Sequence, residues 1–208
     1  MIDLYSVFTA NGQKIHIMLE ECDLEYTAHA VDLHGGAHRT PEFRKLNPFA
    51  RVPVLVDDDG TGGAPVVVSE TLAILDYLAA KAGRLMPADA RGRADVMQWL
   101  ASIAANVGPV FRGEFMFTAV VPGKIQPAID YFKAEAAKAL AMIDDHLRDR
   151  EYLVAGQYTV ADISAYPVAA TSAKRLPDGV APYANIRRWM EAISRRPAVQ
   201  RGMAVLAP

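Results

Sequence analysis

Residues 47–71 read Asn-Pro-Phe-Ala-Arg-Val-Pro-Val-Leu-Val-Asp-Asp-Asp-Gly-Thr-Gly-Gly-Ala-Pro-Val-Val-Val-Ser-Glu-Thr. Proline cannot donate to a β-ladder, so Pro53 is expected to begin a strand rather than to interrupt one. A cis bond before it would be structurally useful there. The Asp- and Gly-rich segment 57–64 predicts a hairpin to a second strand, after which Glu70 and Thr71 open a helix. The stretch therefore predicts a free backbone edge beside a helix N-terminus, where anions bind favourably.

The residues before and after this stretch extend the pattern. A helix packed on one face is predicted by the i, i+3, i+4, i+7 spacing of Ile15, Met18, Leu19 and Cys22. Strands flank that helix, which favours a parallel pair with a right-handed crossover. Gly83 is expected to stop the helix that follows the hairpin. Residues 1–83 thus read as βαβ, a short α and ββα, with strands at 2–6, 26–32, 52–56 and 66–68 and the short helix at 41–46.

The strand signal disappears after a linker at residues 84–88. Gly108 and Pro109 are expected to interrupt or kink one helix, and Thr159 with Asp162 resembles a capping box that starts another. We therefore predict an α/β domain at 1–83 and an all-α domain at 89–208.

Composition excludes several classes of function. The 208 residues carry a formal net charge of −2, which does not favour nucleic acid or an anionic membrane as a partner. No apolar run approaches the ~20 residues that a membrane span needs, and the N-terminus does not resemble a signal peptide. The single cysteine, Cys22, excludes an internal disulfide and suits a reducing cytoplasm. The histidines outside residue 38 are isolated, so no metal site is expected.

The order of the motifs resembles the glutathione transferases. Arg51-Val52-Pro53 followed by Glu70-Thr71 looks like the glutathione-binding core of that family, and the segments 160–163 and 196–199 also resemble it. Within the family, the sequence 8–12, Phe-Thr-Ala-Asn-Gly, is most similar to the bacterial Nu class, which is related to disulfide-bond reductases. The resemblance covers the whole chain.

This resemblance implies a thioredoxin-like N-terminal domain, an all-helical C-terminal domain and a cytoplasmic homodimer. It implies an enzyme that takes glutathione as co-substrate, with no permanently bound cofactor, and transfers its sulfur to a small hydrophobic electrophile or uses it to reduce a disulfide. The alternative is a non-catalytic binding or regulatory protein on the same fold. Two departures favour that alternative, because His38 stands where members have Gln and Tyr131 stands where they often have Arg.

Glutathione is an extended tripeptide, and the motif residues match its polar groups. The backbone of Val52, held open by a cis bond to Pro53, is expected to pair with the cysteinyl backbone as an added strand. Thr71 is expected to bind the γ-glutamyl carboxylate and Glu70 the γ-glutamyl amine. Arg51 and His38 are candidates for the glycyl carboxylate. The alternatives are a rigid turn at Val52-Pro53 and solvated surface positions for Arg51 and His38.

Catalysis requires the glutathione sulfur as a thiolate, whereas a free thiol has a pKa of about 8.5. Thr9 and Asn11, in a loop just before the first helix, are the candidate catalytic residues, because both can donate a hydrogen bond to a sulfur anion. Helix capping alone would also explain them. Tyr5 is expected to pack in the sheet, and a catalytic role is the alternative, because the resemblance implies that other glutathione transferases use a Tyr near the end of this strand. Cys22 is expected in the core, so disulfide exchange would run through glutathione sulfurs.

An aromatic and Met-rich segment is the candidate for the pocket of the second substrate, although ordinary core packing explains it equally well. It contains Phe111, Arg112, Phe115, Met116 and Phe117.

Overall fold

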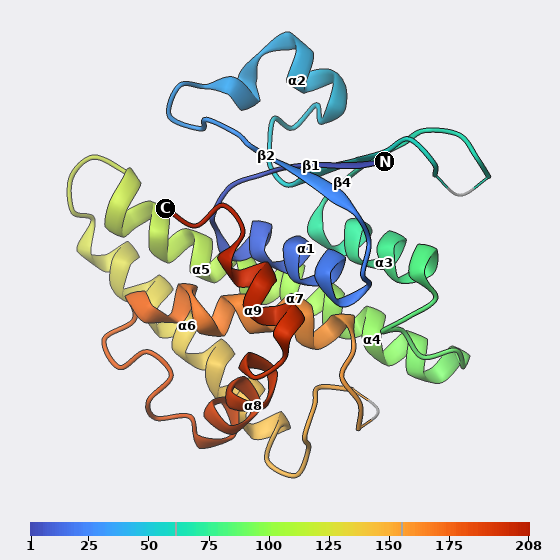
Figure 1. The fold of residues 1–208 in the computed structure, drawn as a ribbon. Coiled ribbons are helices and arrows are strands. Elements are labelled where there is room, and N and C mark those ends of the chain that lie inside the picture. The colour runs from blue at the N-terminus through green and yellow to red at the C-terminus, as the bar shows by residue number, and fades with distance from the viewer. Residues whose placement is uncertain (61, 155) are drawn as a thin grey trace. The chain divides into compact units, whose positions relative to one another are not determined.

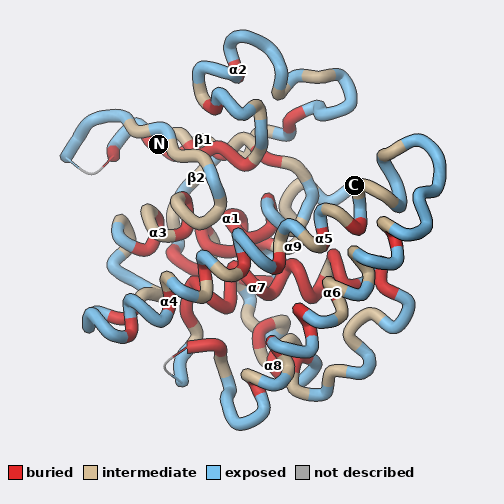
Figure 2. Tube along the Cα trace, turned by 180° about the vertical axis from the view of Figure 1, so that it is seen from behind, coloured by how far each residue is buried: buried red, intermediate tan, exposed pale blue. Residues whose placement is uncertain are grey.

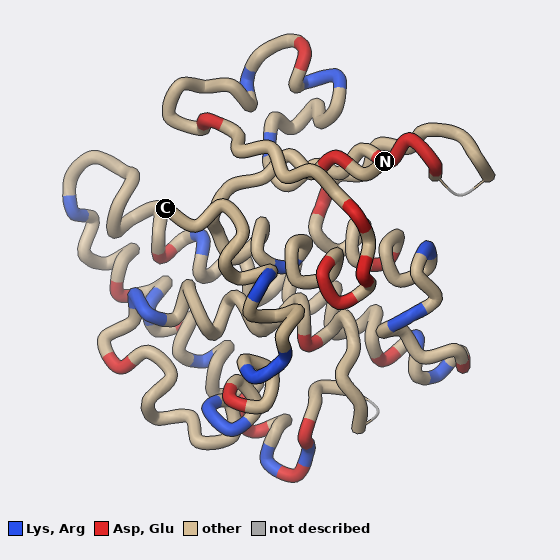
Figure 3. Tube along the Cα trace, in the orientation of Figure 1, with Lys and Arg blue, Asp and Glu red and all other residues tan. Residues whose placement is uncertain are grey.

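The computed structural model describes residues 1–60, 62–154 and 156–208, and it divides into two compact units. The first unit contains Met1–Leu85 together with Arg196–Pro208, and the second contains Met86–Arg195. The sequence assigned all of 89–208 to one helical domain, whereas the last thirteen residues belong with the first unit. Figure 3 shows acidic and basic residues interspersed along both units.

The first unit is built on a four-stranded sheet of order β2-β1-β3-β4 (Figure 1). β1 pairs parallel with β2, and the pairs β1–β3 and β3–β4 are antiparallel, as the strand–helix–strand opening and the hairpin predict. β3 begins one residue after Pro53, which therefore precedes the strand rather than forming its first residue. The strands are β1 (Ile2–Ser6), β2 (Tyr26–Ala30), β3 (Val54–Asp57) and β4 (Val66–Ser69).

Helices cover both faces of this sheet. Figure 1 shows α1 and α3 on one face and α2 on the other. α3 ends where Gly83 adopts a left-handed conformation, φ 64°, as expected from its sequence. The helices of this unit are α1 (Ala10–Glu21), the 3₁₀ turn η1 (Ala37–Arg39), α2 (Pro41–Leu46), α3 (Thr71–Ala82) and α9 (Pro197–Ala204).

On the α2 face, a small apolar cluster forms around Val31, Phe43 and Val54. Tyr5 and Val52 pack against this cluster. The Tyr5 ring meets that of Phe43 edge-on at 6.3 Å between centroids, so Tyr5 packs in the sheet as expected.

Helix α1 is buried along almost its whole length, whereas the sequence pattern indicated burial of one face only (Figure 2). The reason is α9, whose Gly202 approaches so closely that a Cβ there would lie 2.6 Å from the Ile17 backbone. Glu21 accepts two hydrogen bonds from Arg196, at 2.6 and 2.8 Å, across the same helix pair. The C-terminal helix therefore holds α1 in place.

The β3–β4 hairpin is anchored to α3 through a buried carboxylate. Asp57 accepts a hydrogen bond of 2.6 Å from the Tyr77 hydroxyl and forms an ion pair of 2.8 Å with Lys81. Burial alone would raise the pKa of Asp57, but the hydrogen bonds from Lys81, Tyr77 and the Asp59 backbone outweigh it and lower that pKa. This contact fixes the strand β4 relative to the helix that follows it.

The second unit is helical apart from an isolated bridge between Val154 and Gln157, within the part that the structure describes. Two π-helical segments flank α5, and the first of them makes the interruption expected at Gly108-Pro109. The elements are α4 (Ala90–Ser102), η2 (Ile103–Val107), α5 (Gly108–Phe115), η3 (Met116–Val120), α6 (Gln126–His146), α7 (Val160–Ala170), η4 (Ser172–Arg175) and α8 (Ala184–Ser194). None of the described helices is long and apolar enough to cross a membrane.

Helix α7 forms the core of this unit, and all of its residues are buried (Figure 2). Thr159 and Asp162 make the capping box that the sequence indicated. Asp162 also accepts hydrogen bonds from the Leu153 backbone at 3.0 Å and from the Trp189 ring at 2.9 Å. The predicted fold class, an α/β domain followed by a helical one, is confirmed.

Candidate functional site

The strand register brings several predicted site residues to one edge of the first unit's sheet. Tyr5 near the end of β1 pairs with Val54 at the start of β3, and Val54 pairs with Ser69 at the end of β4. The segments that carry Thr9 and Asn11, Val52 and Pro53, and Glu70 and Thr71 therefore all leave the sheet at this edge. β2 ends at the same edge, since its Ala30 pairs with Ser6, and the segment with His38 and Arg51 starts there.

Thr9 is the N-cap of α1, and its hydroxyl oxygen accepts a hydrogen bond of 3.4 Å from the Gly12 backbone. Asn11 is the second residue of that helix, so the expectation of a loop at this position is wrong. The cap at Thr9 starts the helix earlier than the apolar spacing alone indicates. Gly12 permits this geometry, because a Cβ there would lie 2.2 Å from the Val7 carbonyl oxygen. Thr9 and Asn11 both lie exposed at the positive end of the helix dipole.

Lys14 is a residue of this site that the sequence reasoning missed. Its side chain is buried, and its Nζ donates a hydrogen bond of 3.0 Å to Oδ1 of Asn11. Burial lowers the pKa of Lys14 to about 8. The i, i+3 spacing from Asn11 is the signal that could have indicated this contact.

The peptide bond between Val52 and Pro53 is cis. Val52 lies outside the strand ladder, and no backbone hydrogen bond of Val52 is found within residues 1–60, 62–154 and 156–208. Its side chain packs on the Val31–Phe43–Val54 cluster. The position of this backbone is therefore fixed by packing, while its polar groups stay available to a ligand.

Asn47 shapes the loop that leads to Val52, and sequence reasoning gave it no such role. The Asn47 side chain is buried, donates a 2.9 Å hydrogen bond to the Arg51 carbonyl oxygen and accepts one of 3.0 Å from the Phe49 backbone. A buried amide that bonds both ends of a short loop rigidifies it. The Asn-Pro pair at 47–48 marked this turn in the sequence.

Glu70 has an unusual backbone conformation, φ 70° and ψ 125°, immediately before α3. Few residues other than glycine adopt positive φ, and such strain is most often found at functional sites. The Glu70 side chain is exposed and makes no capping hydrogen bond. Thr71 is the first residue of α3, so its backbone N–H lies at the positive end of that helix.

His38 and Arg51 lie between β2 and β3. Nε2 of His38 accepts a hydrogen bond of 3.3 Å from Arg39 Nε, which assigns the proton of the neutral ring to Nδ1. That Nδ1 is buried and has no partner among the described residues. The Arg51 side chain is exposed, and no ion pair of Arg51 is found in the described parts of the chain. No hydrogen bond or ion pair between His38 and Arg51 is found in those parts.

Cys22 is buried in the core, as expected, and is unpaired. Burial raises the pKa of its thiol to about 11, so the thiolate form is scarce at neutral pH. This cysteine is therefore not suited to act as a nucleophile.

The aromatic segment of the second unit divides between core and surface. Phe111 is buried, whereas Phe115 is 43% exposed with the Arg175 guanidinium 5.4 Å from its ring centroid. Phe117 stacks on Phe132 at 5.5 Å. Arg112 is exposed, and Met116 is half-buried.

Tyr131 is 59% exposed on α6. Its ring meets that of Phe132 edge-on at 5.3 Å between centroids. Tyr131 thus presents its phenol to solvent.

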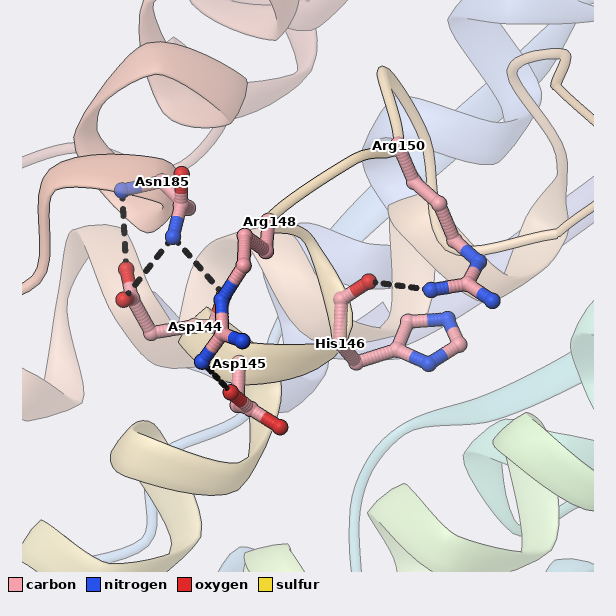
Figure 4. A network of polar contacts seen from close by, with 6 residues as sticks. All are labelled: Asp144, Asp145, His146, Arg148, Arg150 and Asn185. Carbon is pink, nitrogen blue, oxygen red and sulfur yellow. Dashed lines mark hydrogen bonds and ion pairs between the residues drawn. The ribbon is translucent and has the colours of Figure 1, made fainter.

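A surface pocket of about 470 Å³ lies where α6 and α8 meet in the second unit, lined in part by Arg148, Arg150 and Arg188. Figure 4 shows Arg148 paired with Asp145 and Arg150 donating to the His146 carbonyl oxygen at 2.9 Å. Arg150 and Arg188 donate to the carbonyl oxygens of His146 and Leu147 at the end of α6, so these two guanidinium groups have a structural role. No group of His, Cys, Asp and Glu able to hold a metal is found among the described residues.

Comparison with known proteins identifies the family. Residues 8–81 match the model of the glutathione S-transferase N-terminal domain, and residues 109–197 match that of the C-terminal domain. The chain is 35% identical over 208 residues to disulfide-bond oxidoreductase YfcG of Escherichia coli (strain K12), covering 99% of this chain and 95% of that protein.

Two solved structures are also similar to it. A glutathione transferase from Pseudomonas putida, with one glutathione disulfide bound per subunit, has a TM-score of 0.93 and 32% identity, covering 99% of this chain and 92% of that one. A glutathione transferase from Burkholderia graminis, with two glutathione molecules bound per subunit, has a TM-score of 0.92 and 35% identity, covering 98% and 88%. The resemblance drawn from the motifs is confirmed, and the chain belongs to the glutathione S-transferase family.

Proposed function

We propose that this protein is a glutathione transferase that binds glutathione at the sheet edge described above and stabilises its thiolate. It conjugates the sulfur to small hydrophobic electrophiles and also reduces disulfides with glutathione. The observation that carries the proposal is the convergence at one edge of an unpaired Val52 backbone, the strained Glu70 before a helix N-terminus, and the Thr9–Asn11 helix start. Family relatives with bound glutathione or glutathione disulfide support it.

Val52, Thr71 and Glu70 bind the middle and the γ-glutamyl end of glutathione. The Val52 N–H and C=O pair with the cysteinyl backbone as an added strand. Thr71 binds the γ-glutamyl carboxylate through its N–H and hydroxyl, and the Glu70 carboxylate binds the γ-glutamyl amine. Because packing already fixes Val52, little ordering entropy is lost at this contact when the ligand binds.

The glycyl carboxylate is assigned to His38 and Arg51. The His38 ring is half-buried, and its Nδ1–H, which has no partner among the described residues, reaches a ligand carboxylate once the ring turns outward. The Arg51 guanidinium adds a positive charge from the same connecting segment.

The sulfur is assigned to Thr9 and Asn11. The Thr9 oxygen accepts from Gly12, which leaves its O–H free to donate to a thiolate. The Asn11 oxygen accepts from Lys14, which leaves its NH₂ free to donate as well. Together with the positive end of α1, these donors favour the thiolate over the thiol.

Conjugation forms a carbon–sulfur bond between this thiolate and the electrophile, while the leaving group departs with its electron pair. In disulfide reduction, the thiolate attacks one sulfur of the disulfide and expels the other as a thiolate, which takes up a proton. A second glutathione thiolate then attacks the glutathione sulfur of the mixed disulfide and expels the second thiolate, which also takes up a proton. Two glutathiones are thereby oxidised to glutathione disulfide as one disulfide is reduced to two thiols. The high pKa of Cys22 supports exchange through glutathione alone.

The test compares a chloronitrobenzene-type electrophile and a small dialkyl disulfide as substrates for the wild type and for Thr9→Ala, Asn11→Ala and the double variant. Each donor lost to a charged sulfur removes ~1.5–3 kcal/mol, which corresponds to roughly 10- to 100-fold in rate. Unchanged turnover in the double variant would refute the catalytic assignment.

Calorimetry with glutathione and with glutathione disulfide distinguishes the enzyme from a non-catalytic protein on the same fold. The departures at His38 and Tyr131 are the observations that favour the second candidate. Binding of glutathione without turnover of either substrate would support it, and no binding of either compound at millimolar concentration would rule out the enzyme.

We also infer a cytoplasmic homodimer, on the basis of family membership and the single buried thiol. Sedimentation velocity tests the assembly. A mass that stays monomeric across the working concentration range would contradict it.

A further inference from the structure

Lys14 has an environment that its residue type rarely occupies. Only 2% of it is exposed, and the partner that the structure records for its ammonium is Oδ1 of Asn11, at 3.0 Å. Lysine is almost never fully buried unless it is paired, because desolvation of the charge is costly. A methionine would fill similar volume without that cost, so the ammonium must serve the contact that it makes.

The contact settles which way the Asn11 amide points. A primary amide has an accepting oxygen and a donating NH₂ that occupy nearly equivalent positions, whereas an ammonium group can only donate. Oδ1 of Asn11 must therefore face Lys14, and the NH₂ must point away from it. Since Asn11 is exposed while Lys14 is buried, the NH₂ is directed to the accessible side of the helix start.

Without Lys14 the amide could turn over. The oxygen would then face the ligand, and its lone pairs would repel a thiolate. The ammonium also polarises the amide, because hydrogen bonds in a chain strengthen one another. Burial lowers the pKa of Lys14 to about 8, so the group remains mostly protonated at pH 7 and can supply this polarisation.

We propose that Lys14 is a positioning residue that locks the Asn11 amide with its NH₂ toward the glutathione sulfur and thereby stabilises the thiolate through Asn11. The inference rests on the proposed function, because it gives Lys14 a role only if Asn11 faces the sulfur.

The test is a double-mutant cycle on Lys14→Met and Asn11→Ala, read by ultraviolet titration of the thiol of bound glutathione. Lys14→Met is expected to raise that thiol pKa by about half to one unit, which lowers the thiolate-to-thiol ratio at any given pH about three- to tenfold. In the Asn11→Ala background, Lys14→Met should cause no further change. Affinity for S-methylglutathione, which has no thiol to ionise, should stay within about twofold of wild type.

Two further variants complete the design. Lys45→Met removes an exposed lysine of α2 and should leave the thiol pKa unchanged. Lys14→Gln keeps a donor toward Asn11 without the charge and should fall between wild type and Lys14→Met. If Lys14→Met does not fold, Lys14→Gln replaces it in the cycle.

The outcomes separate the two proposals. The thiol pKa could be unchanged in Lys14→Met and Lys14→Gln but raised in Asn11→Ala. That result would overturn the role of Lys14 and leave the proposed function intact. Lys14→Met could also raise the thiol pKa equally in the wild type and in the Asn11→Ala background. That result would overturn the positioning role, since Lys14 would then act directly on the sulfur. A thiol pKa that ignores Asn11→Ala and Thr9→Ala would instead overturn the catalytic assignment itself.

Discussion

Replacing Glu70 with glycine should weaken the binding of glutathione without reducing the stability of the fold. Glu70 is held at φ 70° and ψ 125°, a conformation that costs a non-glycine residue ~1–3 kcal/mol. Glycine, which has no Cβ, tolerates this conformation at lower cost, but the greater entropy of its unfolded chain offsets roughly 0.4–1 kcal/mol of that gain. The Glu70 carboxylate also interacts favourably with the positive end of α3, and its loss removes about 0.3–1 kcal/mol of stability. Glu70→Gly should therefore unfold with a free energy that is unchanged or raised by about 1 kcal/mol.

The affinity of Glu70→Gly for glutathione should fall. A hydrogen bond from the γ-glutamyl amine to a carboxylate contributes ~1.5–3 kcal/mol, so its loss raises the Kd of glutathione roughly 10- to 100-fold. Urea denaturation measures the first quantity, and isothermal titration calorimetry measures the second.

Two control variants sharpen this prediction. Glu70→Gln removes the charge and keeps the strained backbone, so it should weaken binding with little gain in stability. Asp23→Gly relieves a positive φ of 53° elsewhere in the first unit, where the exposed pair with Arg84 contributes little. It should leave the Kd unchanged. A Glu70→Gly protein that loses more than about 2 kcal/mol of stability, or that binds glutathione within about twofold of wild type, would refute the reasoning.

Three further predictions concern the helix that carries Thr9. Gly202→Ala places a Cβ 2.6 Å from the Ile17 backbone, and overpacking of this kind costs ~1–3 kcal/mol. The melting temperature should therefore fall by about 2–10 °C. An unchanged melting temperature would show that the α1–α9 contact is loose. Gly12→Ala places a Cβ 2.2 Å from the Val7 carbonyl oxygen, so the Kd of glutathione and the turnover should worsen even where circular dichroism shows a folded protein, and wild-type kinetics would contradict this. Burial lowers the pKa of His16 from 6.5 to about 4. Between these two pH values His16 is protonated in the unfolded chain but neutral in the folded protein, so the free energy of unfolding should fall as the pH drops from about 6.5 to about 4. His16→Gln should flatten that part of the denaturation profile, and an equally steep profile would assign the effect to other groups.

Features set by neighbouring residues were predictable from the sequence. The antiparallel pairing of β3 with β4, the stop at Gly83 and the capping box of Thr159 and Asp162 each depend on side chains within a few positions of one another. Their order along the chain was enough to predict the fold class and to reveal the family resemblance.

Features set by distant contacts were not predictable. The apolar spacing of α1 shows one face, whereas its burial on the other faces depends on α9, nearly 200 residues away in sequence at Gly202. The burial of Lys14 depends on tertiary packing, whereas its bond to Asn11 is a local i, i+3 contact that the helix spacing allows. The unpaired Nδ1 of His38 likewise depends on how the segment between β2 and β3 packs.

A crystal structure of this protein grown with glutathione tests the central claim most directly. We predict density for an extended tripeptide whose cysteinyl backbone pairs with Val52, whose γ-glutamyl end meets Glu70 and Thr71, and whose sulfur lies within hydrogen-bond distance of Thr9 or Asn11. Density for glutathione at any other surface, or an empty sheet edge at saturating glutathione, would contradict the account.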